Sequence, residues 1–152
     1  MRAVVQRVTS ATVRSRSDAA AEFETVGEVG PGMCVLVGVT HADSEVQADT
    51  LADKLAGLRI FDDEDGVMNV GATEVGAAFL VISQFTLYGD TSRGRRPSWV
   101  DAARPDHAEP LIARVVERLR AAGAVVETGR FRTEMEVELV NDGPVTLMLD
   151  VD

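Results

Sequence analysis

The stretch Met33-Cys34-Val35-Leu36-Val37-Gly38-Val39 is a continuous apolar run of strand length. Such a run predicts a strand that is buried on both faces. Residues 77–85 (AAFLVISQF) form a second run of this kind, which continues directly into Thr86-Leu87-Tyr88. Turn-forming residues precede the first run, at Gly27, Gly30, Pro31 and Gly32. Two buried strands therefore mark the interior, and the flanking sequence must cover them.

Further strands are predicted near both ends of the chain. Residues 4–8 predict a first strand, with residues 11–14 either continuing it or pairing with it. Residues 135–140 alternate in the manner of a half-buried strand, and residues 145–149 predict the last one. The sequence Asn-Asp-Gly-Pro at residues 141–144 predicts a turn between these two strands.

Two helices are predicted between the strands. Ser44 and Gln47 resemble a capping box, and the apolar spacing that follows predicts an amphipathic helix ending near Gly57. A second helix is predicted over residues 106–122, although Pro110 leaves its start ambiguous because proline belongs at the first helical position. One face of this helix carries Ile112, Val115, Val116 and Leu119.

The length of 152 residues and the mass of 16.3 kDa correspond to one domain. No internal repeat, linker or low-complexity tract interrupts the sequence. We therefore expect a single α/β domain over residues 1–152, mixed in class, with a mainly antiparallel, barrel-like sheet and two helices.

Composition excludes several classes of function. A net charge of -10 and a pI near 4.6 exclude a general electrostatic coat for DNA, but not a local nucleic-acid pocket. A single cysteine forms neither an internal disulfide nor a cysteine-rich zinc site, and Cys34 is expected to be a small buried hydrophobe. No segment has the ~18 apolar residues of a membrane span. We therefore expect a cytoplasmic protein without a membrane partner.

Few residues offer familiar catalytic or metal chemistry. The two histidines, His41 and His107, adjoin no nucleophile motif, and no metalloprotease or hydrolase signature is present. The acidic residues 62–66 lack the register of a calcium loop, so no metal site is expected. Polar residues 83–86 follow a buried strand, where a rigid scaffold often presents functional groups. The alternative is that these side chains only satisfy backbone groups at the strand end.

Five motifs, taken in order, resemble the D-aminoacyl-tRNA deacylase family from Met1 to Val151. They are QRV at 6–8, SQFTL at 83–87, RGRRPSW at 93–99, TGRF at 128–131 and LVNDGPVT at 139–146. The resemblance implies a homodimer that hydrolyses the ester joining a D-amino acid, or glycine, to the terminal adenosine of tRNA, with no cofactor. The sequence at 83–86 favours the D-specific branch over a related vertebrate-type deacylase.

The resemblance also implies roles for individual residues. The catalytic pocket would contain Ser83, Gln84, Phe85 and Thr86. Chiral selection would come from Gly143 and Pro144, joined by a cis peptide and lent to the neighbouring subunit's pocket, with Arg7 holding that turn across the interface. The arginines at 93, 95 and 96 (Arg93, Arg95 and Arg96) suit the phosphates of tRNA; the alternative is a solvated loop.

Three segments depart from the family pattern. Residues 15–22 are longer than usual and are expected to form a loop or a lengthened hairpin tip. Trp99 stands where phenylalanine is commoner. The sequence Arg132-Thr133-Glu134 follows Phe131 where small residues are usual, in a stretch assigned to the pocket for the terminal adenosine.

The implied mechanism relies on backbone geometry more than on an acid or base. Two carbonyl oxygens of the Gly-Pro turn would hold the substrate's ammonium group, so that an L side chain meets a backbone wall while glycine passes. The ribose hydroxyl of the substrate would assist water, with N–H groups near Phe85 and Thr86 as the oxyanion hole. The alternatives are a Thr86 or Ser83 nucleophile, and a dimer that binds aminoacyl-tRNA without cleaving it.

Overall fold

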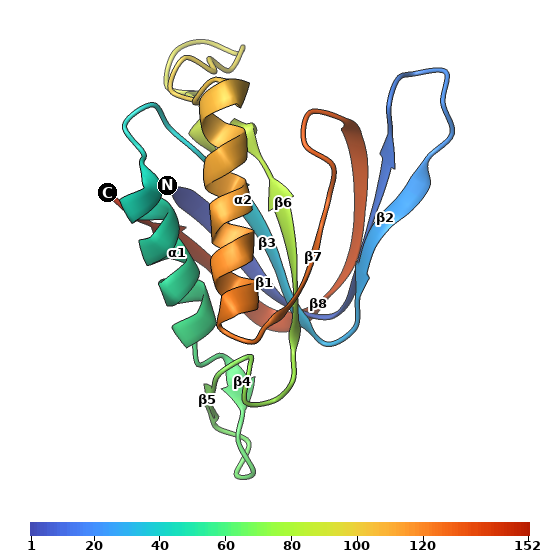
Figure 1. Ribbon diagram of the computed structural model, residues 1–152, viewed down its shortest axis with the longest axis vertical. Helices are drawn as coiled ribbons and strands as arrows, with labels where there is room; N and C mark the ends of the chain where they lie inside the picture. Colours follow the sequence, from blue (N-terminus) through green and yellow to red (C-terminus); the bar gives the residue numbers. More distant parts are fainter.

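The first strand organises the sheet in the computed structural model, which describes all 152 residues. β1 (Arg2–Arg16) pairs along one edge with β8 (Glu134–Asp150). Its other edge pairs first with β3 (Gly32–Gly38) and then with β2 (Glu24–Val29), and all three pairings are antiparallel. Figure 1 shows the two termini side by side, where Val151 donates a hydrogen bond to the Met1 carbonyl.

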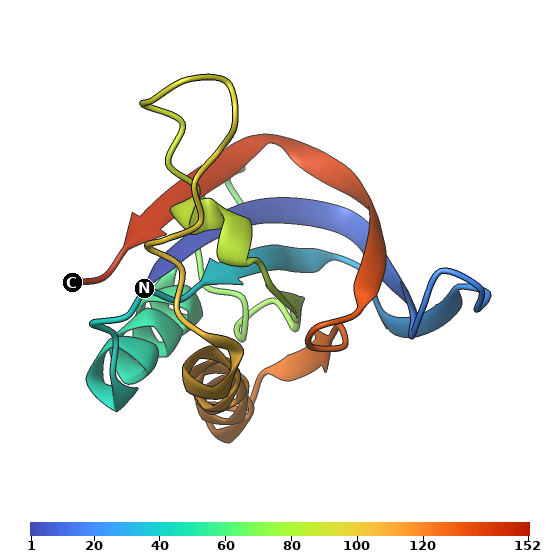
Figure 2. The same cartoon turned by 90° about the horizontal axis from the view of Figure 1, so that it is seen from above.

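The sheet continues from β3 into two parallel strands. β6 (Ala78–Ser83) pairs with β3, and β7 (Val125–Thr128) pairs with β6, giving the order β2-β1-β3-β6-β7 with β8 on β1. Figure 2 shows how strongly the sheet curls, with β8 arching over the side opposite the helices. The mixed class, the barrel-like curvature and the antiparallel majority are confirmed. The parallel strand β7 was not predicted.

Both helices lie on one side of the sheet (Figures 1 and 2). α1 (Glu45–Gly57) starts at the predicted capping box of Ser44 and Gln47. α2 (Pro105–Ala121) has Pro105 in its first turn, so Pro110 lies inside the helix. The buried faces of both helices pack on the sheet and form the larger core cluster. Neither helix combines the length and apolarity needed to cross a bilayer.

The predicted strand boundaries need several corrections. Residues 11–14 continue β1, and β6 stops at Ser83 instead of reaching Phe85, because the chain turns there into the 3-10 helix η1 (Phe85–Tyr88). Gly27 lies inside β2 and not in a turn. Close packing explains the glycine, because a Cβ there would lie 2.8 Å from the Thr128 carbonyl oxygen. A small hairpin of β4 (Phe61–Asp62) and β5 (Met68–Val70) frames the exposed acidic residues, which form the expected turn.

The prediction of a turn at residues 141–144 is wrong. These residues form a bulge within the continuous strand β8, where Gln6 pairs with Thr146 but Val8 pairs with Asn141. The Asn141 side-chain amide closes the bulge by donating to the carbonyls of Arg7 (2.9 Å) and Val145 (3.2 Å). Pairing with β1 on both sides of the bulge therefore keeps the strand intact where the local sequence favours a reversal.

Candidate functional site

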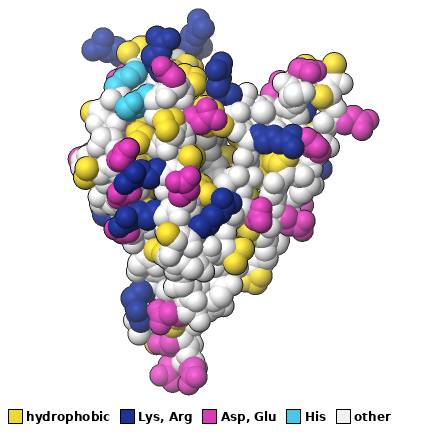
Figure 3. Space-filling view, viewed as in Figure 1, with side chains coloured by type: hydrophobic (Ala, Val, Ile, Leu, Met, Phe, Trp, Pro, Cys, Tyr) yellow, Lys and Arg dark blue, Asp and Glu magenta, His cyan; other side chains and the backbone are white.

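A cavity of about 720 Å³ lies where the end of β6, the start of α2 and the loop between β7 and β8 meet. Figure 3 shows the notch between the α2 side of the molecule and the arm that carries β2. The wall combines motif residues with apolar residues from distant elements. Its lining includes Ser83, Gln84, Phe85, Trp99, Ala103, Ala108, Phe131, Arg132, Thr133, Glu134, Met135 and Val137.

The end of β6 presents the predicted catalytic residues. Gln84 donates its backbone N–H to the Val37 carbonyl at 2.7 Å, which fixes the chain as it leaves the sheet. The Gln84 side-chain amide donates to Thr86 Oγ1 at 2.5 Å. Ser83, Gln84 and Phe85 line the cavity, whereas Thr86 is not part of its lining and is half-buried. The N–H groups of Phe85 and Thr86, first in η1, have no acceptor within that helix.

Three aromatic side chains, Phe85, Trp99 and Phe131, form an apolar wall of the cavity. Phe85 and Trp99 meet edge to face, with ring centroids 5.5 Å apart and an interplanar angle of 69°. Trp99 also packs so closely on Gly89 that a Cβ at residue 89 would lie 2.4 Å from the indole ring. Phe131 approaches from the β7–β8 loop and packs against the core. Phe85 and Trp99 remain partly exposed, so this aromatic wall offers ring faces on which a planar group such as a nucleobase can stack.

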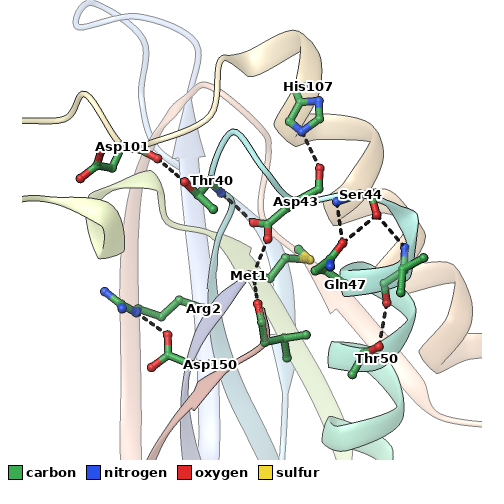
Figure 4. Close-up of polar contacts among 12 residues, drawn as sticks. Met1, Arg2, Thr40, Asp43, Ser44, Gln47, Thr50, Asp101, His107 and Asp150 are labelled. Carbon is green, nitrogen blue, oxygen red and sulfur yellow. Dashed lines mark hydrogen bonds and ion pairs between the residues drawn. The ribbon is translucent and has the colours of Figure 1, made fainter.

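Neither histidine lines this cavity. His107 Nε2 lies 2.8 Å from the Asp43 carbonyl oxygen, as Figure 4 shows, and His41 Nε2 lies 2.8 Å from the Val100 carbonyl oxygen. No histidine or carboxylate forms a hydrogen bond with Thr86 Oγ1. Burial raises the pKa of the Cys34 thiol to about 11, so this side chain is a neutral hydrophobe at physiological pH.

The structure holds no group of three or more histidine, cysteine or carboxylate side chains arranged for a metal ion. The polar groups around the amino terminus are instead paired with one another. The Met1 ammonium nitrogen donates to Asp43 Oδ1 (2.6 Å) and to the Val151 carbonyl (2.5 Å), while Thr40 N donates to Asp43 Oδ2 (2.7 Å) (Figure 4). These contacts tie the ends of β1 and β8 to the start of α1.

Gly143 and Pro144 lie on the β8 bulge and are absent from the wall of this chain's own cavity. Their peptide bond is cis, as the resemblance implies, and both residues are exposed. Arg7 of the same chain is buried beside this bulge, with Nη1 donating to the Ile60 carbonyl at 2.7 Å and to Asp62 Oδ1 at 3.3 Å. Arg7 Nε lies 2.9 Å from Asp142 Oδ2 but its N–H is not aimed there, so this contact is an ion pair without a hydrogen bond.

The three arginines predicted to bind tRNA lie on the loop between η1 and α2. Arg93, Arg95 and Arg96 are exposed and form no ion pair within the chain. Figure 3 shows basic side chains gathered at the end of the molecule where this loop lies in Figure 1. They do not line the cavity, so the loop stands beside it as a separate basic surface.

Sequence reasoning missed the part of the wall that α2 supplies. Pro105 and Ala108 line the cavity from the start of that helix, and Ala103 lines it from the segment just before the helix. Nothing in their local sequence marks them, because they are brought to Phe85 only by the packing of α2 on the sheet. Met135 and Val137 were predicted as strand residues, and the curvature of the sheet turns them toward the cavity.

Comparison with known proteins gives one consistent family. The family model described as D-Tyr-tRNA(Tyr) deacylase matches residues 4–150. The D-aminoacyl-tRNA deacylase of Symbiobacterium thermophilum is 59% identical over 150 residues, which cover 99% of this chain and 95% of that protein. The protein of the same name from Thermotoga petrophila is 53% identical, over 99% of this chain and 97% of that protein.

Solved structures agree on the fold. The c-Myc DNA Unwinding Element Binding Protein superposes with a TM-score of 0.90 at 32% identity, covering 100% of this chain and 99% of its own. A probable eukaryotic D-amino acid tRNA deacylase has a TM-score of 0.79 at 16% identity, covering 99% and 98%, which supports the fold alone.

Proposed function

The chain belongs to the D-Tyr-tRNA(Tyr) deacylase family, and from this membership we propose that it hydrolyses the ester bond of D-aminoacyl-tRNA. Water is consumed, and the free D-amino acid and tRNA are released. The observation that carries the proposal is the position of the family motif at 83–87, whose first three residues line a cavity with an aromatic wall. We further propose that glycyl-tRNA is a substrate, because glycine has no side chain to exclude.

Two copies of the chain form the working enzyme in this proposal. Gly143 and Pro144 of each copy would enter the cavity of the other copy. The exposed position of this dipeptide, away from its own cavity, supports the exchange. The outer edge of β8 is unpaired along its whole length, and Val140 (56% exposed) and Met148 (65% exposed) leave apolar surface on this strand. Such an edge and surface favour association with a second copy.

Chirality would be read by backbone atoms. The carbonyl oxygens of Gly143 and Pro144 from the second copy would bind the α-ammonium group of the substrate, while the ester is bound at the end of β6. With both groups fixed, a D side chain points away from the dipeptide, whereas an L side chain overlaps it. Rejection by overlap excludes every L residue and leaves D side chains of any size acceptable, since no side-chain pocket selects among them.

Catalysis would rely on orientation and on the substrate's own ribose hydroxyl. The free N–H groups at the start of η1, those of Phe85 and Thr86, would stabilise the oxyanion. The ribose hydroxyl beside the scissile carbonyl would position or activate water. A Thr86 nucleophile is the less favoured mechanism, because its hydroxyl accepts from the Gln84 amide and has no neighbouring base.

The basic loop would hold the acceptor end of tRNA. Arg93, Arg95 and Arg96 are free to contact phosphates without reading sequence, which suits an enzyme that accepts many tRNAs. The remainder of the surface is acidic on balance, so this contact would be weak and sensitive to salt. We place the reaction in the cytoplasm, where ribosomes use aminoacyl-tRNA.

The activity is tested with matched D-Tyr-tRNA, L-Tyr-tRNA and Gly-tRNA. The proposal expects release of D-tyrosine and glycine but not of L-tyrosine. Binding of all three without release would identify a binding module instead, and release of both tyrosine isomers would identify an unselective esterase. Replacing the terminal 2′-hydroxyl of D-Tyr-tRNA by hydrogen should abolish turnover; unchanged turnover would rule out assistance by the substrate.

The shared site is tested by mixing two inactive variants. One variant carries Phe85→Ala in the cavity, and the other carries Gly143→Ala with Pro144→Ala on the bulge. If sites are shared between copies, exchange of subunits creates a mixed dimer with one complete site, and activity returns. If each chain builds its own site, the mixture stays inactive. Sedimentation of the wild type shows whether dimers form at all.

A further inference from the structure

The turn between β7 and β8 holds one residue in an unfavourable backbone conformation. Arg132 has a φ of 60°, and no other residue except glycine has a positive φ. This region disfavours side chains that bear a Cβ, and such outliers gather at functional sites. Arg132 lines the cavity described above, directly after Phe131 of its aromatic wall, and is exposed, which places it at the cavity mouth.

The residues on either side hold Arg132 in place. Phe131 packs against the main core. Thr133 Oγ1 donates to the Arg130 carbonyl at 2.9 Å and lies 2.7 Å from Ser15 Oγ of β1. The turn is thus anchored on both sides, so the Arg132 side chain projects from a fixed base at the cavity mouth.

Arg132 is also the only charge in the cavity wall that has no partner. Glu134, the other charged lining residue, is paired with Arg16. The neighbouring Arg130 is paired with Glu24. Arg132 forms neither an ion pair nor a side-chain hydrogen bond within the chain, although the protein carries ten more negative than positive charges. An unpaired guanidinium at a cavity mouth, on a surface rich in carboxylates, is placed for an anion brought by the ligand.

We propose that Arg132 binds a phosphodiester group of the substrate next to its terminal nucleoside. The inference rests on the proposed function, since it takes the occupant of the cavity to be the aminoacylated end of a nucleic acid. With the terminal base against the aromatic wall, the phosphate that links it to the preceding nucleotide leaves through the cavity mouth. A guanidinium there offers a planar pair of donors to two phosphate oxygens. Arg132 is therefore a substrate-positioning residue, separate from the basic loop.

The experiment compares three substrates that differ in phosphate content. These are D-Tyr-tRNA, the D-tyrosyl ester of the trinucleotide CCA, and the D-tyrosyl ester of adenosine, which has no phosphate. For Arg132→Gln we expect KM to rise roughly threefold to tenfold with the first two substrates, and kcat to stay unchanged, because the contact is equal in ground and transition states. Hydrolysis of the adenosine ester should not change. The slope of log KM against log salt should fall by about 0.7, the value of one phosphate contact on a single strand.

Three further variants separate this role from a structural one. Arg132→Lys should retain part of the effect, because it keeps the charge but not the planar pair of donors. Arg132→Gly should show the same kinetic loss as Arg132→Gln while unfolding at the same or a higher temperature, since glycine accepts a positive φ. Arg59→Gln removes an exposed arginine beside the β4–β5 hairpin, at the opposite end of the molecule, and should leave all three substrates unaffected.

The outcomes distinguish this inference from the proposed function. If wild-type protein hydrolyses none of the three D-tyrosyl esters, the proposed function fails and the inference falls with it. If the wild type is active and Arg132→Gln is equally active on D-Tyr-tRNA, only the inference is overturned. An equal loss on the adenosine ester, or dissociation of the dimer by Arg132→Gln, would also overturn it, because neither effect involves a substrate phosphate.

Discussion

Replacing Arg7 by alanine should reduce both the stability and the activity of this protein. Arg7 is 8% exposed and lies under the bulge that carries Gly143 and Pro144. Its Nη1 donates to the Ile60 carbonyl at 2.7 Å, and its guanidinium faces the carboxylate of Asp142. The substitution leaves the Ile60 carbonyl without its donor and removes the ion-pair partner of Asp142, the residue that precedes Gly143 and Pro144.

The expected loss of stability is about 2–4 kcal/mol. The hydrogen bond from a charged donor to the Ile60 carbonyl accounts for roughly 1.5–3 kcal/mol of it. The ion pairs with Asp142 and Asp62 each add less than about 1 kcal/mol, because those side chains are 45% and 53% exposed and water screens both pairs. For a chain of this length the sum corresponds to a fall in Tm of roughly 5–10 °C.

Urea unfolding followed by circular dichroism measures the free energy of unfolding, and deacylation of D-Tyr-tRNA at 25 °C measures activity. We expect kcat/KM to fall by about tenfold or more while the variant is still folded, because the dipeptide loses its support. Arg14→Ala is the matched control, since Arg14 also links β1 to β8, through an exposed pair with Glu136 at 3.1 Å. That change should cost less than about 0.5 kcal/mol. Equal stability of the two variants, or full activity of Arg7→Ala, would refute the reasoning.

Three other outcomes are expected. Gly32→Ala should prevent folding or lower Tm severely, because its Cβ would lie 2.0 Å from the Ala78 carbonyl oxygen of β6. Gly30→Ala is the control and should change Tm little, because open space surrounds that residue. Cys34 should resist a thiol reagent at pH 8 until the protein unfolds, because burial keeps its thiol protonated. The free energy of unfolding should not depend on this thiol below pH 9, and should fall as the pH rises from 9 toward the folded-state pKa of about 11. Trp99, the sole tryptophan, should change its fluorescence when a D-aminoacyl-adenosine analogue binds, and Phe85→Ala should alter that signal; an unchanged spectrum at saturation would place the ligand elsewhere.

The sequence predicted those helices and strands that are determined by their own residues. The helix over residues 44–57 could be predicted because Ser44 and Gln47 supply its cap and the apolar spacing supplies its buried face. The strand over residues 33–39 could be predicted because both of its faces are buried. The prediction of a turn at residues 141–144 was wrong because the outcome there depends on distant residues. Long pairing with β1 overrides the chain reversal that Asn-Asp-Gly-Pro favours in isolation.

The candidate site was predictable in part. The motif at 83–86 ends a strand, as expected, and three of its four residues reach the cavity. The resemblance assigned Phe131 to the adenosine pocket, and that residue does line the cavity beside them. The start of α2 could not be predicted as part of the wall, because its place depends on helix packing. The conformation of Arg132 was equally hidden, since a positive φ at arginine has no signature in sequence.

The pairing of β1 with β8 affects how the chain folds during synthesis. Arg2 pairs with Asp150, and the ladder runs without a change of partner to Arg16 and Glu134. β1 is synthesised before β8, so the edge of β1 that pairs with β8 stays open until β8 has been made. Until then, the open edge of β1 can pair wrongly with other strands, and chaperones protect nascent chains in this condition.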